Sequence, residues 1–433
     1  MSDLSHPQDL VIKGATVLTK TGLVRADVVT CNGVVVALGP DLDAGLGARV
    51  LDGSGCHVIP ALVDLHTHLR EPGGEDAETV MSGSRAAAVG GFGAVVAMPN
   101  TNPPIDSASM VRDVMALGKD ALVDVAVAGT ITVGRKGERL SPFGEMAEAG
   151  VRICTDDGSG VQDAALMRRA LEYASSVGIT LAQHCEDASL AACGVMHEGG
   201  WSSRLGLAGI PAEAEETMAA RDIALASRAG ARLHLMHLST AGSMALLAMA
   251  KQRGAPVSAE VTPHHLSLTD AELSSFDPRF KVNPPLRSEK DRQALLMAVA
   301  DGVVDAIATD HAPHPAHTKQ APLDEASFGM TGLETAFSVV WGQLGHLGIE
   351  AVWRLMSQRP ARIAGLVGHG GPIAEGSAAN LVVVDLEASW TADPSRGVTK
   401  STNSPFAGRS MKGKVKHTVH AGEAVVVDGE PSR

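Results

Sequence analysis

The sequence predicts an α/β fold built around a (β/α)8 TIM barrel, and three observations support this fold class. Eight short apolar runs lie between residues 58 and 314 of the 433-residue chain, Ala-rich stretches separate them, and β-rich segments lie at both ends. Continuous apolar strands interleaved with helices indicate a parallel sheet covered by helices. Eight such units suggest that the sheet closes into a barrel.

The two ends of the chain are predicted to form one small β-sandwich domain. At the N-terminal end, short β-rich runs are broken at Gly, Asn and Asp in LVIKGATVLT, ADVVTCNGVVVALG and ARVLDGSGCHVIP. The C-terminal end repeats this pattern in NLVVVDL and VHAGEAVVVDG. We therefore assign residues 1–58 and 371–433 to the sandwich and residues 59–370 to the barrel.

The predicted barrel strands follow one another at regular intervals along the middle of the chain. In order they are VIPALVDLHTH, GAVVAMPN, DVAVAGTI, GVRICTDD, ITLAQHCED, RLHLMHLST, PVSAEVTPHH and VDAIATDHAPH. Stretches with helical periodicity lie between them, such as AETVMSGSRAAAVGG and DAALMRRALEYASSVG. This alternation predicts eight strand–helix units.

Composition excludes several classes of function. The formal net charge of −13 argues against a nucleic-acid partner, because a phosphate backbone requires a basic surface. We find neither a signal peptide nor a membrane span of about 18 apolar residues, so we expect a soluble, cytoplasmic protein. Five scattered cysteines without a C-x-x-C motif favour buried thiols over disulfides or a thiolate zinc site. Cys185, beside His184, remains a candidate thiolate ligand.

Polar side chains gather where the predicted strands end. In a barrel of this kind the carboxyl ends of the strands form the active-site face. A lone strand-end His or Asp often only caps the next helix, but a whole set of imidazoles and carboxylates on one face favours zinc or a similar divalent ion. More ligands are present than a structural zinc takes, which favours two metals that share a carboxylate and a water. The residues at the strand ends are His66, His68, Asn100, Asp156, Asp157, His184, His237 and Asp310.

A two-metal site predicts hydrolysis with a carboxylate as proton carrier. Two metal ions lower the pKa of a shared water and polarise the group that is attacked. Asp310 is placed to accept the proton of this water and to deliver it to a leaving nitrogen.

Two further residues indicate an anionic substrate. Arg70 shares a strand face with His66 and His68, and a guanidinium binds a carboxylate through two parallel hydrogen bonds. Asn100 offers both a donor and an acceptor. The alternatives are a surface ion pair of Arg70 with Glu71 or Glu75, and a turn role for Asn100.

Eight motifs resemble those of the class I (long-chain) dihydroorotases of the amidohydrolase superfamily. They are VDLHTHLREPGGED, AMPNTNPP, TDDGSGVQ, AQHCEDASL, HLMHLST, AEVTPHHLSLTD, FKVNPPLRSEKDR and IATDHAPH, and they span nearly the whole predicted barrel. The flanking segments fit the small β-sandwich of this family. The resemblance implies reversible hydrolysis of the cyclic amide of (S)-dihydroorotate to N-carbamoyl-L-aspartate, in de novo pyrimidine (UMP) biosynthesis.

The resemblance also implies a role for each matching residue, around two Zn²⁺ ions per subunit. His66, His68 and Asp310 would hold one metal, His184 and His237 the other, and Asp157 would bridge them. Hydantoinases and allantoinases bridge with a carboxylated lysine, and no lysine occurs in GVRICTDDG. The substrate carboxylate would be bound by Arg70, Asn100 and His314, and the ring amide by Asn283 and the backbone of Phe328 and Gly329, with His68 also in contact with the substrate.

Some neighbouring residues receive other interpretations. His264 and His265 end the seventh predicted strand, where adjacent residues face opposite ways, so at most one can reach the site. We assign neither to it. His317 is expected to be a solvated loop residue rather than a third-metal ligand. In the irregular loop 312–330, Ser327 stands at the position where the family more usually has Pro. The sequence therefore does not decide whether this loop closes over the site.

Two alternative functions compete with the dihydroorotase interpretation. One is a hydantoinase or allantoinase, which the absence of the bridging lysine disfavours. The other is a non-catalytic dihydroorotase-like subunit that supports aspartate transcarbamoylase, although such chains typically lack metal ligands. The resemblance also implies a possible complex of an active enzyme with aspartate transcarbamoylase. We otherwise expect a homo-oligomer.

Overall fold

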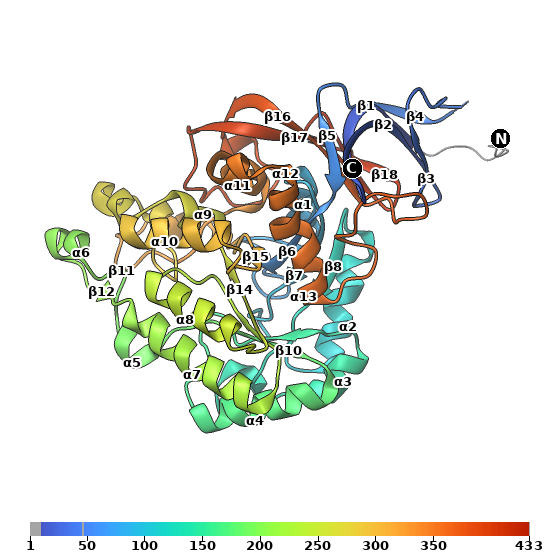
Figure 1. Cartoon of the computed structure of the whole chain (residues 1–433). Coiled ribbons are helices and arrows are strands. Elements are labelled where there is room, and N and C mark those ends of the chain that lie inside the picture. The colour runs from blue at the N-terminus through green and yellow to red at the C-terminus, as the bar shows by residue number, and fades with distance from the viewer. Residues whose placement is uncertain (1–9, 46, 433) are drawn as a thin grey trace.

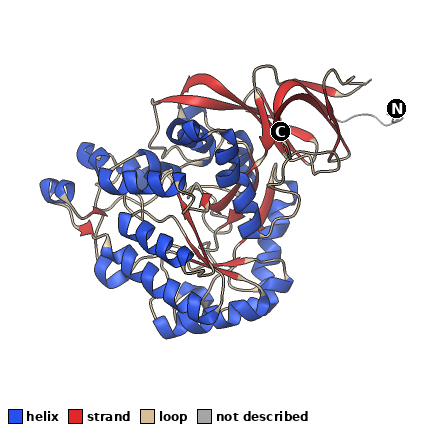
Figure 2. Ribbon diagram, in the orientation of Figure 1, coloured by secondary structure: helices blue, strands red, loops and turns tan. Residues whose placement is uncertain are grey.

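The computed structural model describes residues 10–45 and 47–432 and confirms the α/β class. Short parallel strands lie inside a ring of helices, and a second, larger sheet lies at one side of the molecule (Figure 2). The two ends of the described chain meet in this second sheet (Figure 1). In the described part of the chain, we find no helix with the length and apolar character needed to cross a membrane.

Each of the eight predicted barrel runs contains one strand of the central set. These strands pair in parallel as β6-β7-β8 and as β9-β10-β13-β14-β15. Single bridges from Gly129 to Cys154 and from Thr67 to His311 connect the two groups, so the pairing links all eight strands in a ring. The strands are β6 (Leu62–Thr67), β7 (Phe92–Ala97), β8 (Asp124–Val127), β9 (Ile153–Cys154), β10 (Thr180–Gln183), β13 (Leu233–Leu235), β14 (Val257–Val261) and β15 (Ala306–Ile307).

Helices follow the strands and cover their outer side. Several begin at a Ser, Thr or Asp whose side chain accepts a backbone N–H, as Asp163 does before α4 and Thr240 before α8. The long helices are α1 (Val80–Val89), α2 (Ala108–Leu117), α4 (Ala164–Val177), α7 (Glu213–Ala229), α8 (Ala241–Gln252), α10 (Glu289–Ala300) and α11 (Ala336–Leu344). Shorter ones are α3 (Phe143–Glu148), α5 (Ala188–Ala191), α6 (Gly200–Leu205), α9 (Pro263–Ser267), α12 (Ile349–Trp353) and α13 (Arg359–Ala364).

The second sheet combines strands from the two ends of the chain. Its order is β19-β18-β17-β16-β5-β1-β2-β3, with β4 paired to β1. Strand β5 joins the two ends because it pairs in parallel with β1 and antiparallel with β16. The strands are β1 (Leu10–Thr19), β2 (Gly22–Cys31), β3 (Val34–Gly39), β4 (Arg49–Asp52), β5 (His57–Pro60), β16 (Leu381–Thr391), β17 (Ser410–His420), β18 (Glu423–Val427) and β19 (Glu430–Pro431).

Buried apolar side chains hold the parallel strands, their helices and the nine-stranded sheet in place. The largest cluster fills the space between the parallel strands and their helices, and a second one lies within the nine-stranded sheet. A third cluster combines alanines, such as Ala128, Ala182 and Ala308, with larger side chains, such as Leu65 and Met236.

Candidate metal centre and active site

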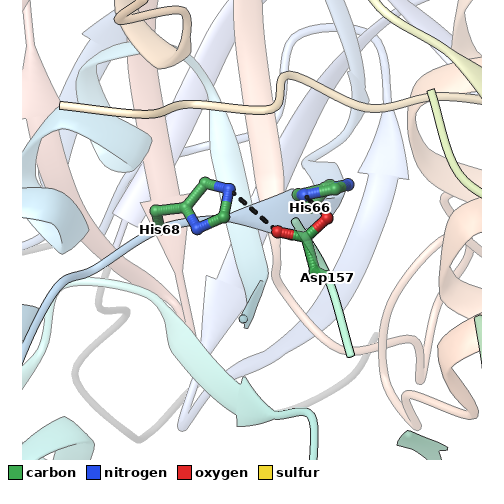
Figure 3. Close-up of side chains that lie close together, drawn as sticks. All are labelled: His66, His68 and Asp157. Carbon is green, nitrogen blue, oxygen red and sulfur yellow. Dashed lines mark ion pairs between the residues drawn. The ribbon is translucent and has the colours of Figure 1, made fainter. Parts of the chain in front are cut away.

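Two histidines from β6 and its following loop share one carboxylate. Figure 3 shows the carboxylate of Asp157 between the rings of His66 and His68. The Oδ1 atom of Asp157 lies 3.4 Å from His66 Nε2, and its Oδ2 atom lies 3.5 Å from His68 Nε2. All three side chains are buried. The alternation of side chains along β6 brings both imidazoles to the same side, as the H-x-H spacing predicts.

A second cluster uses the same carboxylate. The Oδ1 atom of Asp157 lies 3.6 Å from His184 Nδ1 and 3.5 Å from His237 Nε2. These two ring nitrogens are 3.0 Å apart. His184 follows β10 and His237 follows β13, so three separate strand ends converge on Asp157. This carboxylate is therefore common to both candidate ligand groups.

Asp310 completes the first group from the end of β15. Its Oδ1 atom lies 3.5 Å from His66 Nε2 and 3.1 Å from His68 Nε2. Its backbone φ is +47°, and the φ of His237 is +33°. Non-glycine residues seldom adopt these left-handed values, and such strain is concentrated at functional sites.

The donor set and its spacing fit divalent metal ions. Two ligands about 2.0–2.1 Å from a tetrahedral ion lie about 3.3 Å apart, close to most of the separations above. The buried Nε2 atom of His66 has no hydrogen-bond partner, although buried polar atoms in proteins are nearly always paired. The Nε2 atom of His66, which faces two carboxylates at these distances, is therefore a candidate metal ligand.

Behind the first histidine lies a buried chain of polar groups. His66 donates from Nδ1 to Glu260 Oε1 at 3.0 Å, and the other carboxylate oxygen of Glu260 lies 3.0 Å from His234 Nε2. His234 in turn contacts Ser258 Oγ at 2.8 Å. A carboxylate behind a ligating histidine fixes the tautomer and the orientation of the ring. Nε2 of His66 is therefore left to face the candidate metal position.

The electrostatics of the site keep its carboxylates ionised. Burial alone would raise the pKa of Asp157, but the charge of His66 and hydrogen bonds from His184 and His237 hold it well below its usual value. The pKa of Asp310 is likewise lowered by His66 and His68 despite its burial. Ionised carboxylates are the form that binds a cation.

Arg70 points toward the loop after β15 and not toward the acidic residues beside it in sequence. Its Nε atom donates to Pro313 O at 3.1 Å, and its Nη2 atom lies 3.3 Å from His314 Nε2. Glu71 and Glu75 instead accept backbone N–H groups. The surface ion pair considered from the sequence is therefore not what Arg70 forms.

The other loop residues predicted for the substrate lie close to one another. Burial and the Arg70 guanidinium lower the pKa of His314 to about 3, so its ring is neutral. A Cβ placed on Gly329 would lie 2.9 Å from His314 Nε2, which shows how closely the two residues approach. The N–H of Gly329 donates to Lys281 O, two residues before Asn283. Asn283 Oδ1 is buried without a hydrogen-bond partner, which leaves this oxygen available to accept a hydrogen bond from a ligand.

Asn100 lies between two candidate metal ligands. Its Oδ1 atom is 2.9 Å from His68 Nδ1, and its Nδ2 atom donates to Asp157 Oδ2 at 3.2 Å. The amide thus orients both side chains, a contact that sequence reasoning did not anticipate. Its role in binding the substrate carboxylate stays a prediction.

Several other sequence interpretations can be compared with the structure. The expectation that His264 and His265 end the seventh strand is wrong, because β14 stops at Val261 and both histidines lie in α9. Thr262 caps this short helix, and Pro263 at its first position favours helix over strand. His317 is exposed, as expected. Burial raises the pKa of the Cys185 thiol well above its usual value, which disfavours a thiolate ligand.

Sequence reasoning missed three residues that support the site. Glu260 was visible as a lone carboxylate inside the apolar run PVSAEV, where an unpaired charge would be costly. Arg135 donates to the main-chain oxygen of Asp157. Asn403 contacts the loop after β15 from a segment with no predicted element. For the last two the sequence offered no local signal.

Comparisons with known proteins show the family of this chain. A family model described as "Dihydro-orotase-like" matches residues 55–243. The chain is 46% identical to a dihydroorotase of Pelotomaculum thermopropionicum over 97% of this chain and 99% of that protein. It is 47% identical to a dihydroorotase of Streptomyces coelicolor, with the same coverage of both chains. A dihydroorotase of Mycobacterium tuberculosis is 46% identical over 94% of this chain and 96% of its own.

Solved structures show the same fold at lower sequence identity. An L-hydantoinase (dihydropyrimidinase) from Arthrobacter aurescens superposes with a TM-score of 0.86 at 24% identity, over 98% of both chains. A D-hydantoinase gives a TM-score of 0.84 at 21% identity. The family model and the whole-length relatives define a hydrolase of the amidohydrolase superfamily, and its two His and Asp clusters are candidate sites for divalent metal. The relatives that match over nearly the whole chain are dihydroorotases, so the chain belongs to the dihydroorotase family.

Proposed function

We propose that this member of the dihydroorotase family is a class I (long-chain) enzyme that uses two zinc ions. The reaction is the reversible hydrolysis of (S)-dihydroorotate to N-carbamoyl-L-aspartate in pyrimidine biosynthesis. The observation that supports the two-metal proposal is the single carboxylate, Asp157, common to two clusters of buried ligands. His66, His68 and Asp310 would hold one ion, and His184 and His237 the other.

The protein groups around this centre would bind the substrate and move one proton. When bound, metal ions held by these residues would supply Lewis acidity that activates a water and polarises the amide carbonyl. Asp310 accepts the proton of the attacking water and delivers it to the ring nitrogen as the C–N bond breaks. Arg70, Asn100 and His314 hold the carboxylate of the substrate. His68, Asn283 and the backbone of Phe328 and Gly329 contact the substrate and its ring amide.

We also propose how the molecule is divided and where it acts. The eight parallel strands would form a closed (β/α)8 barrel over residues 59–370, and residues 1–58 and 371–433 a β-sandwich. In support of a boundary close to these positions, strand β5 of the second sheet ends at Pro60 and strand β6 of the parallel set begins at Leu62. We propose a cytoplasmic homo-oligomer, with aspartate transcarbamoylase as a possible partner. Size-exclusion chromatography of both proteins mixed and alone tests the partner, because a complex gives a joint peak.

Assays on the purified chain test the function directly. We expect turnover of dihydroorotate in both directions, far above that of hydantoin or allantoin, together with about two zinc ions per chain by elemental analysis. Turnover without any partner protein would rule out the non-catalytic subunit. Preferential turnover of hydantoin, or loading with a single metal, would contradict the proposal.

Asp310→Asn tests the proton carrier. Asparagine keeps one oxygen toward the metal position but cannot accept a proton, so kcat should fall by about 10²–10⁴-fold while most of the metal stays bound. Elemental analysis and steady-state kinetics on the same sample measure both quantities. A variant with normal kcat would assign the proton transfer to another group.

A further inference from the structure

One segment near the C-terminus reaches the loop that carries part of the proposed substrate site. This loop, residues 312–330, begins just after Asp310 and contains His314, Phe328 and Gly329. The segment 398–404 leads toward β17 of the nine-stranded sheet, and its residue Asn403 is buried with 4% of its surface exposed. The substrate loop is thus held partly from the other end of the chain.

The carboxamide of Asn403 bonds to both ends of the loop. Its Nδ2 atom donates to Ala312 O at 3.0 Å and to Gly329 O at 3.2 Å. Its Oδ1 atom accepts the N–H of His314 at 3.2 Å. The main-chain oxygen of Asn403 accepts the N–H of Thr331 at 3.2 Å. Both amide hydrogens are therefore used, and the orientation of the amide is fixed by its partners.

The hydrogen bonds of Asn403 lie at the place where the two ends of the loop 312–330 come close together. A Cβ on Gly329 would lie 2.8 Å from the Cβ of Ala312 and 2.9 Å from His314 Nε2, so these side chains pack against the Gly329 backbone. The N–H of Ala312 also donates to Met330 O at 2.9 Å, which pairs the two ends of the loop. On the other side of the loop, Arg70 donates to Pro313 O at 3.1 Å. The distance between His314 and Gly329 therefore depends on groups that hold the loop from outside.

We infer that Asn403 is a positioning residue for substrate binding. It holds His314 and the Phe328–Gly329 backbone at the spacing that the carboxylate and the ring amide of dihydroorotate require. This inference rests on the proposed function, since it assumes that these three residues contact the substrate. Within the described part of the chain, the side chain of Asn403 forms its hydrogen bonds with the loop and with none of the proposed metal ligands, so its loss should weaken binding more than it slows the chemical step.

Two substitutions and one matched control test this role. Asn403→Ala removes all three side-chain bonds. Asn403→Asp keeps the shape and the acceptor but places an oxygen opposite two carbonyl oxygens. Asn380→Ala is the control, because Asn380 is also buried, donates to Gly368 O at 3.1 Å and accepts from Ala421 N at 2.8 Å, away from the loop.

The expected result separates binding from catalysis and from folding. In both Asn403 variants KM for dihydroorotate should rise by about 10-fold or more, kcat should change by less than about 3-fold, and bound metal should stay constant. Hydrogen exchange of peptides from 312–330 should become faster. Asn380→Ala should lower the thermal midpoint without changing KM or exchange in the loop.

Other outcomes would overturn the inference. Unchanged KM in the Asn403 variants, or an equal rise of KM in Asn380→Ala, would make Asn403 an ordinary structural residue. If the wild-type chain does not turn over dihydroorotate, the proposed function fails, while the exchange experiment still reports whether Asn403 orders the loop. If either Asn403 variant does not fold, the other one decides the result.

Discussion

Asp157 has contacts that its neighbour Asp156 lacks, although both lie at the same strand end. Asp157 faces four histidines, whereas Asp156 accepts the backbone N–H groups of Ile131 and Thr132 at 2.8 and 3.0 Å. Because an aspartate is already ionised near neutral pH, no carbon dioxide is needed to form the proposed bridge. One carboxylate thus lies in the proposed metal site, and the other accepts hydrogen bonds from the neighbouring backbone.

We predict that metal loading is independent of bicarbonate and depends on Asp157. Asp157→Ala should lose most of the second metal, because a shared anion offsets the repulsion between two dications. Asp156→Ala should keep both metals and show a lower thermal midpoint. Reconstitution of apo protein with and without bicarbonate, followed by elemental analysis, measures this. Loss of metal in Asp156→Ala but not in Asp157→Ala would reverse the assignment.

Arg70 is the subject of a second prediction, since its guanidinium donates a hydrogen bond to the loop 312–330. Lysine keeps the charge but loses the bond to Pro313 O and the paired donors, so Arg70→Lys should lower kcat/KM by about 10- to 100-fold. Glu75→Gln is the control, because among the described residues the Glu75 carboxylate accepts the N–H of Gly73 and forms no ion pair with Arg70. Steady-state kinetics with dihydroorotate compare the three proteins. Equal losses in both variants would restore the ion-pair interpretation.

At the scale of elements, the sequence predicted the positions of the barrel strands better than their lengths. Buried parallel strands are continuous apolar runs, so all eight were found. The run GVRICTDD contains only the two-residue strand β9, and a turn follows at residues 157–159. The run VIPALVDLHTH divides into β5 and β6, which join different sheets. Apolar character alone does not mark where a strand leaves its sheet.

The candidate site was predictable where its residues follow strands and unpredictable elsewhere. His66, Asp157 and Asp310 could be placed together because the strand ends of a barrel meet at one face. Asn403 could not, because its contact with the loop spans 89 residues of sequence and depends on how the last segment folds back. Pairings of this kind arise from tertiary structure and leave no local pattern.

The substrate loop contains a buried lysine, which predicts a pH effect on stability. Lys319 is 7% exposed, and its Nζ atom donates to Lys281 O at 3.1 Å and to Ser327 O at 2.7 Å. Burial, together with the charge of Lys281, lowers the pKa of Lys319 from 10.5 to about 7. Between these two values the unfolded chain binds more protons than the folded chain, so this residue makes stability rise with pH. Below pH 7 the cost of burying the ammonium group is fully present.

Lys319→Met should therefore flatten the pH dependence of the thermal midpoint. The thermal midpoint of the variant should exceed that of wild type by the largest amount near pH 6. This difference should shrink as the pH rises toward 9.5. Thermal unfolding at pH 6, 8 and 9.5 measures the difference, with Lys136→Met as the control at an exposed lysine. Parallel curves for wild type and Lys319→Met would show that Lys319 does not titrate in this range.

At the scale of the whole molecule, the nine-stranded sheet is attached to the helical ring through α11 (Figure 1). Ser338 donates from Oγ to Gly413 O at 2.6 Å, and Trp341 donates from Nε1 to Leu386 O at 3.0 Å. Strand β17 passes so close to this helix that a Cβ on Gly413 would lie 2.7 Å from the Trp341 ring. The contact requires a residue without a side chain in the strand.

Gly413→Ala should therefore destabilise the protein by more than backbone strain alone. Gly413 has a φ of +79° and Gly408 a φ of +75°, but a Cβ on Gly408 would meet nothing within 4 Å. Alanine in this left-handed region costs about 1–2 kcal/mol at either position, and overpacking against Trp341 should add about 1–3 kcal/mol at Gly413 only. Urea denaturation of both variants measures the difference in unfolding free energy. If the two losses are equal, the strand can move away from α11 at little cost, and the attachment depends on the hydrogen bonds rather than on close packing.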